Sequence, residues 1–166
     1  GVQTCALPIC RTGDGWEKYD EVPFEDGLST GYAGLTDDGS TLYLRESRGR
    51  NTSALFAIDT ATGERRLVHE DARADVGGGL ADPATGEVQA VSVNYLREEW
   101  TVLDDAIRAD LERIAAIGPG EASINTRTLD DRTWIVAYSA AESPVEYYRY
   151  DRAGHGNGEL THLFSG

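Results

Sequence analysis

Short apolar runs separated by clusters of turn-forming residues dominate the chain from residue 31 onward. The first clear example has apolar runs at 41–44 and 54–58, with Asp, Gly, Ser and Asn clusters before, between and after them. Runs of β-branched and aromatic residues bounded by such clusters are typical of β-strands joined by turns. The stretch from Asp37 to Asp59 therefore predicts a hairpin of two buried strands.

The hairpin pattern recurs at a spacing of 46 residues. Moving 46 positions along the chain from Thr41 reaches Glu87, and moving 46 more reaches Thr133. The second strand of the hairpin repeats with the same spacing, and its equivalent positions are Phe56, Val102 and Tyr148. Each first strand follows a turn, at 36–39, 82–86 and 129–132. This period is close to the roughly 40 to 50 residues of a propeller blade and far from the roughly 34 of helical-hairpin repeats.

Further apolar runs complete each unit. We predict strands at 31–35 and 65–69 in the first unit, at 76–80, 87–95 and 100–103 in the second, and at 123–129, 133–139, 145–150 and 159–164 in the third. Four short antiparallel strands make up a propeller blade. The fold class is therefore all-β, an incomplete β-propeller of about three four-stranded antiparallel blades at about 31–70, 76–117 and 121–164.

One segment has helical periodicity. From Asp104 to Ile117, apolar residues recur at steps of three and four, Asp104 and Asp105 supply an N-cap and first-turn charge, and the sequence Gly118-Pro119-Gly120 ends the run. We predict one amphipathic helix at about 104–117, in place of the fourth strand of the second blade.

The two ends of the chain suggest a piece of a longer protein. Propellers close with about 4 to 8 blades, so three blades leave the ring open. Residues 11–30 combine glycines with a few apolar anchors, and we interpret them as the tail of a preceding blade and a connection. Residues 1–9 resemble the translation of a sequencing-adapter oligonucleotide, so we set residues 1–10 aside as an artefact, with Cys5 and Cys10 in it.

The acidic composition narrows the choice of partners. With 29 acidic residues, 15 Lys and Arg residues and a formal charge of −14, the chain repels nucleic-acid backbones and anionic membrane surfaces. No apolar run approaches the roughly 18 residues that a membrane-spanning helix requires. We expect no nucleic-acid partner, no membrane partner, no cofactor and no metal.

Three patterns that might carry chemistry have simpler explanations. Gly27-Leu28-Ser29-Thr30-Gly31 matches the G-x-S-x-G nucleophile elbow, but the elbow needs a buried strand before the serine and a helix after it, whereas a strand is predicted after Ser29. The histidines lack the spacing of metal ligands, and turn preference explains the paired aspartates; these residues are His69, His155, His162, Asp37, Asp38, Asp104, Asp105, Asp130 and Asp131. We expect no catalytic residue among them.

A group of arginines is the best candidate for a contact with substrate or partner. Arg45, Arg48 and Arg50 lie on and beside the linker of the first hairpin, close to Glu46. Arginine binds carboxylates bidentately. Surface ion pairing is the alternative explanation.

The longer runs resemble one family. They are similar to the propeller of the prolyl oligopeptidase family of serine peptidases, in its bacterial branch of acylaminoacyl-peptidases and dipeptidyl-aminopeptidase-like enzymes; the runs are 38–44, 47–55, 95–104 and 129–139. The resemblance implies a propeller that restricts access to a C-terminal α/β-hydrolase domain with a Ser-Asp-His triad. It also implies short peptides as substrates and slightly favours a cytoplasmic location. No triad motif can be assigned to this sequence.

Two functions therefore remain open. The chain is either part of the substrate-gating propeller of such a peptidase, with the catalytic domain missing from it, or part of a stand-alone propeller that binds or scaffolds another molecule. On both hypotheses the chain by itself is inactive. The missing hydrolase domain is the expected partner in the first case, and the reading frame beyond Gly166 distinguishes the two.

Overall fold

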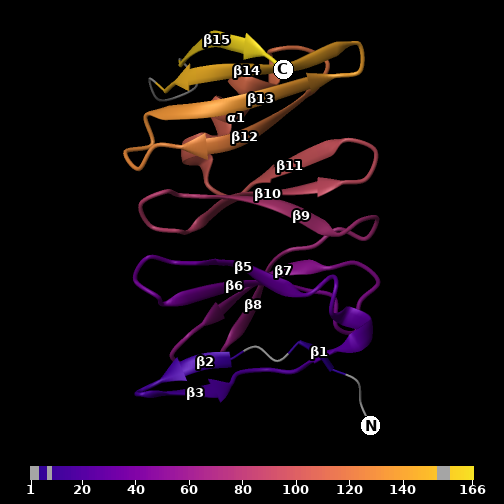
Figure 1. The fold of residues 1–166 in the computed structure, drawn as a ribbon, viewed down its shortest axis with the longest axis vertical. Helices are drawn as coiled ribbons and strands as arrows, with labels where there is room; N and C mark the ends of the chain where they lie inside the picture. Colours follow the sequence, from indigo (N-terminus) through magenta and orange to yellow (C-terminus); the bar gives the residue numbers. More distant parts are fainter. Residues whose placement is uncertain (1–3, 7–8, 153–157) are drawn as a thin grey trace. The chain divides into compact units, whose positions relative to one another are not determined.

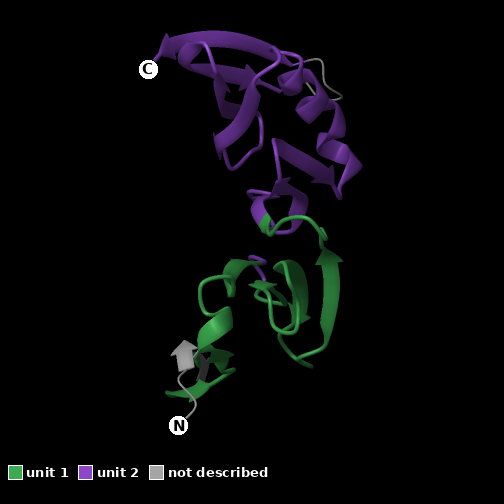
Figure 2. Cartoon of the chain, turned by 90° about the vertical axis from the view of Figure 1, so that its right-hand side faces the viewer, with its two compact units in different colours: residues 1–35, 39–76 green, residues 36–38, 77–166 purple. Residues whose placement is uncertain are grey.

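The structure, a computed structural model, describes residues 4–6, 9–152 and 158–166 (Figure 1). The chain divides into two compact units (Figure 2). Unit 1 comprises residues 1–35 and 39–76, and unit 2 comprises residues 36–38 and 77–166. Each unit is described by itself.

Unit 1 contains one four-stranded antiparallel sheet, in the order β5-β6-β7-β8. Its strands are β5 (Gly31–Leu35), β6 (Thr41–Glu46), β7 (Ala54–Asp59) and β8 (Arg65–His69). Tyr43, Leu55 and Ile58 are buried in it. The predicted hairpin and both of its predicted flanking strands are confirmed.

The segment before this sheet has more structure than the sequence analysis expected. It forms two small sheets, β1 with β4 and β2 with β3, and one 3-10 helix. The elements are β1 (Thr4–Ala6), β2 (Ile9–Thr12), β3 (Gly15–Lys18), β4 (Val22–Pro23) and η1 (Phe24–Asp26). Glycine and proline obscure these short strands in the sequence pattern, and the interpretation of residues 11–30 as the tail of a preceding blade and a connection stays a prediction. The origin of residues 1–10 stays a prediction.

Unit 2 contains a three-stranded sheet, a short helical segment and a four-stranded sheet. The sheet orders are β11-β10-β9 and β12-β13-β14-β15, and all pairings within the second sheet are antiparallel. The elements are β9 (Val76–Ala81), β10 (Val88–Asn94), β11 (Glu98–Val102), η2 (Asp105–Ile107), α1 (Arg108–Ala115), β12 (Glu121–Arg127), β13 (Thr133–Ala140), β14 (Ser143–Asp151) and β15 (Glu159–Ser165).

Strand register confirms the repeat. In each of the three sheets the second strand pairs with the third at positions that differ by the same 46 residues. The three pairs are Leu44 with Phe56, Ala90 with Val102, and Val136 with Tyr148. The same 46-residue offset therefore relates the strand pairing of all three sheets. The sheets are blades of an incomplete β-propeller.

In the middle blade the chain continues from β11 into the predicted helix rather than into a fourth strand. Its first turn is a 3-10 helix, and the Asp104 side chain accepts a hydrogen bond from the backbone N–H of Ala106 at 2.9 Å. Four residues at helical spacing point into the core of unit 2; Ile107 and Ile114 are buried, and Leu111 and Ile117 pack against them. The same core contains Trp134 from β13 and Tyr150 from β14. The helix therefore packs into unit 2 along its apolar face.

Aspartate side chains hold several of the turns, as the sequence analysis expected. The Asp59 carboxylate accepts from the backbone N–H groups of Ala61 and Thr62, and Asp82 does the same in another hairpin of identical pattern, Asp-x-Ala-Thr-Gly-Glu. The glycine of each turn has a positive φ, 75° at Gly63 and 74° at Gly86. These carboxylates thus have a structural role in the turns.

Candidate functional site

The arginines proposed for a substrate contact lie in unit 1 among carboxylates of the same unit. The Arg48 guanidinium donates to both carboxylate oxygens of Asp20, at 2.9 and 2.6 Å, and to Glu46 at 2.7 Å. Arg65 shares Glu46 at 2.8 Å. Arg50 forms an ion pair with Glu70. Two of the three predicted contact residues are thus neutralised by charges within the chain.

This pairing changes the acid–base properties of the cluster. The hydrogen bond with Asp20, and secondly the one with Glu46, raises the pKa of Arg48 above its usual value. The hydrogen bond from Arg48 lowers the pKa of Asp20 below its usual value of 3.8. Arg45 lies on β6 and is half-buried. A contact of Arg45, Arg48 or Arg50 with a substrate stays a prediction.

Ser29 lacks the surroundings of a nucleophile. It follows the 3-10 helix η1 and precedes strand β5, the reverse of the strand and helix that an elbow requires. Its hydroxyl lies 2.6 Å from the Ser47 hydroxyl, which donates to Asp26 at 2.7 Å. These contacts join the loop before β5 to the linker after β6, and none of them involves a histidine.

The two described histidines lie in different units. His69 ends β8 in unit 1, and His162 lies on β15 in unit 2, where its ring makes a T-shaped contact with Tyr148. His155 and most of the glycine-rich segment around it lie outside the described residues. Within residues 4–6, 9–152 and 158–166, no group of three or more His, Cys, Asp and Glu residues is arranged to hold a metal ion.

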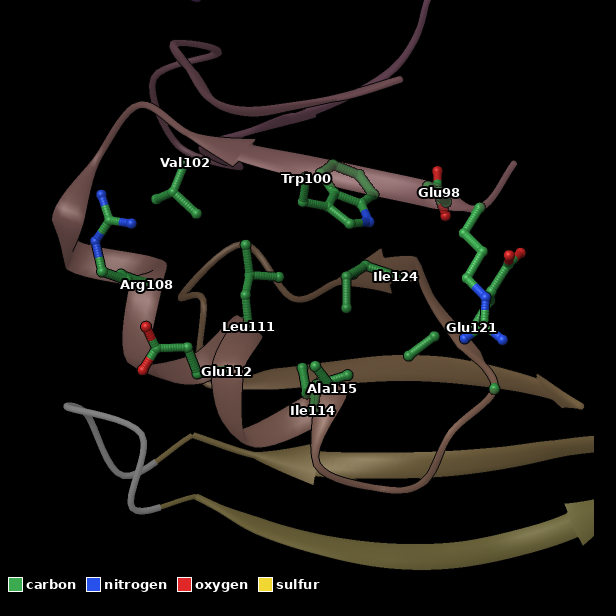
Figure 3. A pocket seen from close by; sticks show the side chains of 13 residues that line it. Glu98, Trp100, Val102, Arg108, Leu111, Glu112, Ile114, Ala115, Glu121 and Ile124 are labelled. Atoms are coloured by element: carbon green, nitrogen blue, oxygen red, sulfur yellow. The ribbon is translucent and has the colours of Figure 1, made fainter. Parts of the chain in front are cut away.

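Unit 2 contains a groove of about 430 Å³ between β11, α1 and β12. Alternate residues of β11 line it, namely Glu98, Trp100 and Val102, as expected for one face of a strand. One face of α1 lines the opposite wall at helical spacing, with Leu111 and Ala115 among its residues. Figure 3 shows the Trp100, Leu111 and Ile124 side chains directed into the space between these elements. The groove therefore has apolar walls.

Charged residues line the ends of the groove. Glu98 and Glu121 lie together at one end, and Arg108 and Glu112 at the other (Figure 3). The Arg108 guanidinium is held by Asp105 at 2.6 and 2.8 Å. Arg97, also in the lining, donates to the carbonyl of Pro119 at 3.1 Å. The lining thus contains three glutamates and two arginines, and one of the arginines, Arg108, is already paired with Asp105. Only Arg97 lacks a carboxylate partner among the described residues, so the groove is acidic.

A buried polar cluster holds the helix to the last sheet. Asp110 on α1 is fully buried, and its carboxylate accepts from the Tyr150 hydroxyl at 2.7 Å and from Arg152 Nε at 2.6 Å. Arg152 also donates to the carbonyl of Ala106 at 2.6 Å. Burial, and secondly the hydrogen bond to Asp110, raises the pKa of Tyr150 to about 12. We call Asp110, Tyr150 and Arg152 the helix clamp.

The clamp continues into the turn before β13. Asp131 has a positive φ of 55° and accepts from Trp134 Nε1 at 2.7 Å, from Arg127 Nε at 2.6 Å and from Arg152. The guanidinium groups of Arg127 and Arg152 lie 4.5 and 5.5 Å from the centre of the Trp134 ring, within the range of cation–π attraction. The second aspartate of this turn is therefore a half-buried group with a structural role.

Comparison with known proteins identifies relatives of the chain. It is 71% identical over 150 residues, 90% of its length, to dipeptidyl aminopeptidase BIII of Pseudoxanthomonas mexicana. It is 28% identical over 139 residues, 82% of its length, to dipeptidyl peptidase family member 6 of Caenorhabditis elegans. The chain belongs to the prolyl oligopeptidase family. It spans about a fifth of the length of these relatives, 21% and 19% respectively. No family model and no solved structure matches.

As a propeller portion of a prolyl oligopeptidase-family protein, the chain has no triad residues that we can assign. Both relatives are named as dipeptidyl peptidases, so the acylaminoacyl-peptidase part of the expected branch stays a prediction. No described helix is long and apolar enough to cross a membrane.

Sequence reasoning missed the groove and the helix clamp of this family member. Asp110 follows a helical residue pattern and carries no local signal that it is buried. Its partners Tyr150 and Arg152 lie 40 and 42 positions further on. The one available hint was that Asp110 lies three positions after Ile107 and four before Ile114, the spacing of residues on one helix face.

Proposed function

We propose that this chain is part of the substrate-gating propeller of a prolyl oligopeptidase-like serine peptidase that cleaves short peptides, with the catalytic residues on an α/β-hydrolase domain elsewhere in the protein. The observation that carries the proposal is the 71% identity to a dipeptidyl aminopeptidase over nearly the whole chain. The blade repeat supports the propeller part of it. The alternative of a stand-alone binding propeller is not favoured by either relative.

The structure supports a role other than catalysis for this portion. The serine of the elbow-like motif lies between a 3-10 helix and a strand, and the carboxylates of buried Asp110 and half-buried Asp131 bind arginine, tyrosine and tryptophan side chains. A rigid propeller contributes to catalysis by restricting which substrates enter and by excluding bulk water from the reacting groups. The helix clamp supplies such rigidity, because it joins the helical insertion to strand β14 of the next blade and to the residue that follows this strand.

The substrate class follows the relatives' printed names. We propose that the full-length protein removes dipeptides from peptides with a free amino terminus. Hydrolysis of dipeptidyl p-nitroanilides by the full-length protein tests this, with the N-acetylated forms of the same substrates as the matched control. Release of nitroaniline from the free forms alone is expected. Equal or faster hydrolysis of acetyl-aminoacyl p-nitroanilides would instead favour an acylaminoacyl-peptidase, and no hydrolysis of either would contradict the proposal.

Gating has its own test. A series of free-amine peptides of 4 to about 40 residues should show kcat/KM falling steeply with length in the full-length protein. Asp110→Ala, which loosens the helix clamp, should raise the relative rate on the long peptides and leave the rate on the dipeptidyl p-nitroanilide unchanged. Asp105→Ala, an exposed residue of the same segment, is the control. A length profile that Asp110→Ala leaves unaltered would contradict gating by this part of the propeller.

A further inference from the structure

The middle blade differs from the other two at its outer side. In the sheets β5–β8 and β12–β15, the third strand pairs with a fourth, β7 with β8 and β14 with β15. The corresponding strand β11 is the last of its sheet, and the chain continues from it into η2 and α1. Within the described part of the chain, no strand pairs with the outer edge of β11.

The backbone of β11 can be oriented from its pairing with β10. The N–H of Leu103 donates to the carbonyl of Gln89 at 2.8 Å, and the ladder continues antiparallel toward Glu98. Backbone groups of an antiparallel strand alternate between its two sides. Those of Glu99 and Thr101 are therefore directed toward β10, and those of Glu98, Trp100 and Val102 toward the open edge.

The same three residues direct their side chains into the groove. Glu98, Trp100 and Val102 line the 430 Å³ hollow, whereas Glu99 and Thr101 do not. A strand added along this edge would place every second side chain on the face that Trp100 occupies, beside the groove. An unpaired edge with an adjacent apolar groove is the arrangement that recognises extended peptides, since the backbone gives affinity and the groove selects side chains.

We propose that the edge of β11 is a non-catalytic binding site for a short extended peptide, which adds to the sheet as a fourth strand. This inference rests on the proposed function, because a peptidase of short peptides encounters such ligands. The other two blades add their fourth strands antiparallel, so the same direction is assigned here. The carboxyl-terminal part of the peptide then lies near Glu98, and its amino-terminal part near Val102.

Charge specifies the peptide further. Apolar side chains fit beside Trp100 and Val102, where Leu111 and Ile124 complete the walls. A basic side chain fits the end that carries Glu98 and Glu121. The site therefore takes a segment with apolar residues at alternate positions followed by lysine or arginine.

The probe is acetyl-Leu-Thr-Leu-Thr-Lys-amide, whose acetyl group removes the free amino terminus that the proposed activity needs. Binding to the full-length protein is measured by isothermal titration calorimetry, and the site is located by hydrogen exchange. We expect the amides of Trp100 and Val102 to gain protection on addition of the peptide, while the amide of Thr101 is protected beforehand. Replacing the lysine by glutamate should weaken binding about threefold or more, as expected for loss of a partly exposed charge pair.

Backbone methylation separates strand addition from adhesion of the side chains. N-methylation of the central leucine removes an N–H directed at β11 and should weaken binding at least about tenfold, the combined effect of a lost hydrogen bond and a steric clash. N-methylation of the first threonine, whose N–H points away, should have little effect. Equal effects of the two methylations would overturn the proposal.

Protein variants complete the test. The double variant Glu98→Gln with Glu121→Gln should lose the preference for lysine over glutamate, whereas Glu99→Gln, on the other face of the same strand, should keep it. Protection of the Trp100 and Val102 amides in the absence of peptide would show that a segment of the protein itself fills the edge, and would overturn the proposal. Hydrolysis of dipeptidyl p-nitroanilides on the same preparation reports the proposed function separately, so a failure of one is distinguishable from a failure of the other.

Discussion

Removal of the Asp110 carboxylate should release the helical insertion from the last sheet. Asp110 is fully buried and accepts hydrogen bonds from Tyr150 and Arg152. Asp110→Ala leaves the buried Tyr150 hydroxyl without an acceptor and takes one carboxylate from Arg152. Breaking a buried pair by removing one partner typically costs about 3 to 5 kcal/mol. Because Arg152 keeps Asp131 and the Ala106 carbonyl, we expect the lower end, about 3 kcal/mol.

Native-state hydrogen exchange of the full-length protein measures this cost where it arises. The free energy of opening of α1 should fall by about 3 kcal/mol in Asp110→Ala. In Asp110→Asn it should fall by about half as much, since the amide keeps one acceptor oxygen but turns an N–H group toward a donor. The control Asp105→Ala removes an exposed ion pair with Arg108 and should change the opening free energy by less than about 0.5 kcal/mol.

A double-mutant cycle with Tyr150→Phe identifies the partner. If the two side chains act through their hydrogen bond, Tyr150→Phe should be less harmful in the Asp110→Ala background than alone, with a coupling of about 1 kcal/mol or more. Equal protection of α1 in Asp110→Ala and Asp105→Ala, or additive effects in the cycle, would refute the helix clamp.

Three further predictions concern pH and packing. Because the pKa of Tyr150 is raised to about 12, its neutral form stabilises the fold fully below pH 10. This contribution should decline between pH 10 and 12 by up to about 1.4 kcal/mol per pH unit. Denaturant titrations at pH 9 and 11.5 should show a smaller loss of unfolding free energy in Tyr150→Phe than in the parent protein. Asp20 has a lowered pKa through Arg48, so its contribution is present above pH 3.8 and is lost as the pH falls further; acid unfolding should begin at higher pH in Arg48→Ala, whereas the exposed Arg66→Ala should unfold as the parent does. In Gly158→Ala the new Cβ would lie 2.3 Å from the Tyr150 ring, so a loss of about 1 to 3 kcal/mol is expected in thermal unfolding, and an unchanged melting temperature would contradict the packing.

Local signals in the sequence were sufficient for the blades. Turn clusters around Gly39, Gly63 and Gly86 bound the strands, and these glycines adopt the positive φ that such turns require. The equal spacing of Phe56 and Val102 predicted equal register, because one face of each sheet must be buried for the repeat to persist. Even the helical insertion was readable, from apolar residues at steps of three and four.

The sites were not predictable in the same way, because their parts are distant in the sequence. Arg48 was a candidate for binding a substrate, but its carboxylate partner Asp20 lies 28 positions earlier. The edge of β11 is open because the chain continues into a helix instead of a fourth strand. The predicted helix points to this open edge only when the strands of the whole blade are counted. The groove beside it depends on how α1 packs against β12, and residue patterns do not specify that packing.

Activity assays on the 166-residue chain and on the full-length protein, with the same dipeptidyl p-nitroanilide, measure whether catalysis needs residues outside this chain. We expect turnover by the full-length protein and none by the chain alone, because the chain contributes propeller blades and no catalytic group. Turnover by the chain alone that Ser29→Ala abolishes would contradict this expectation.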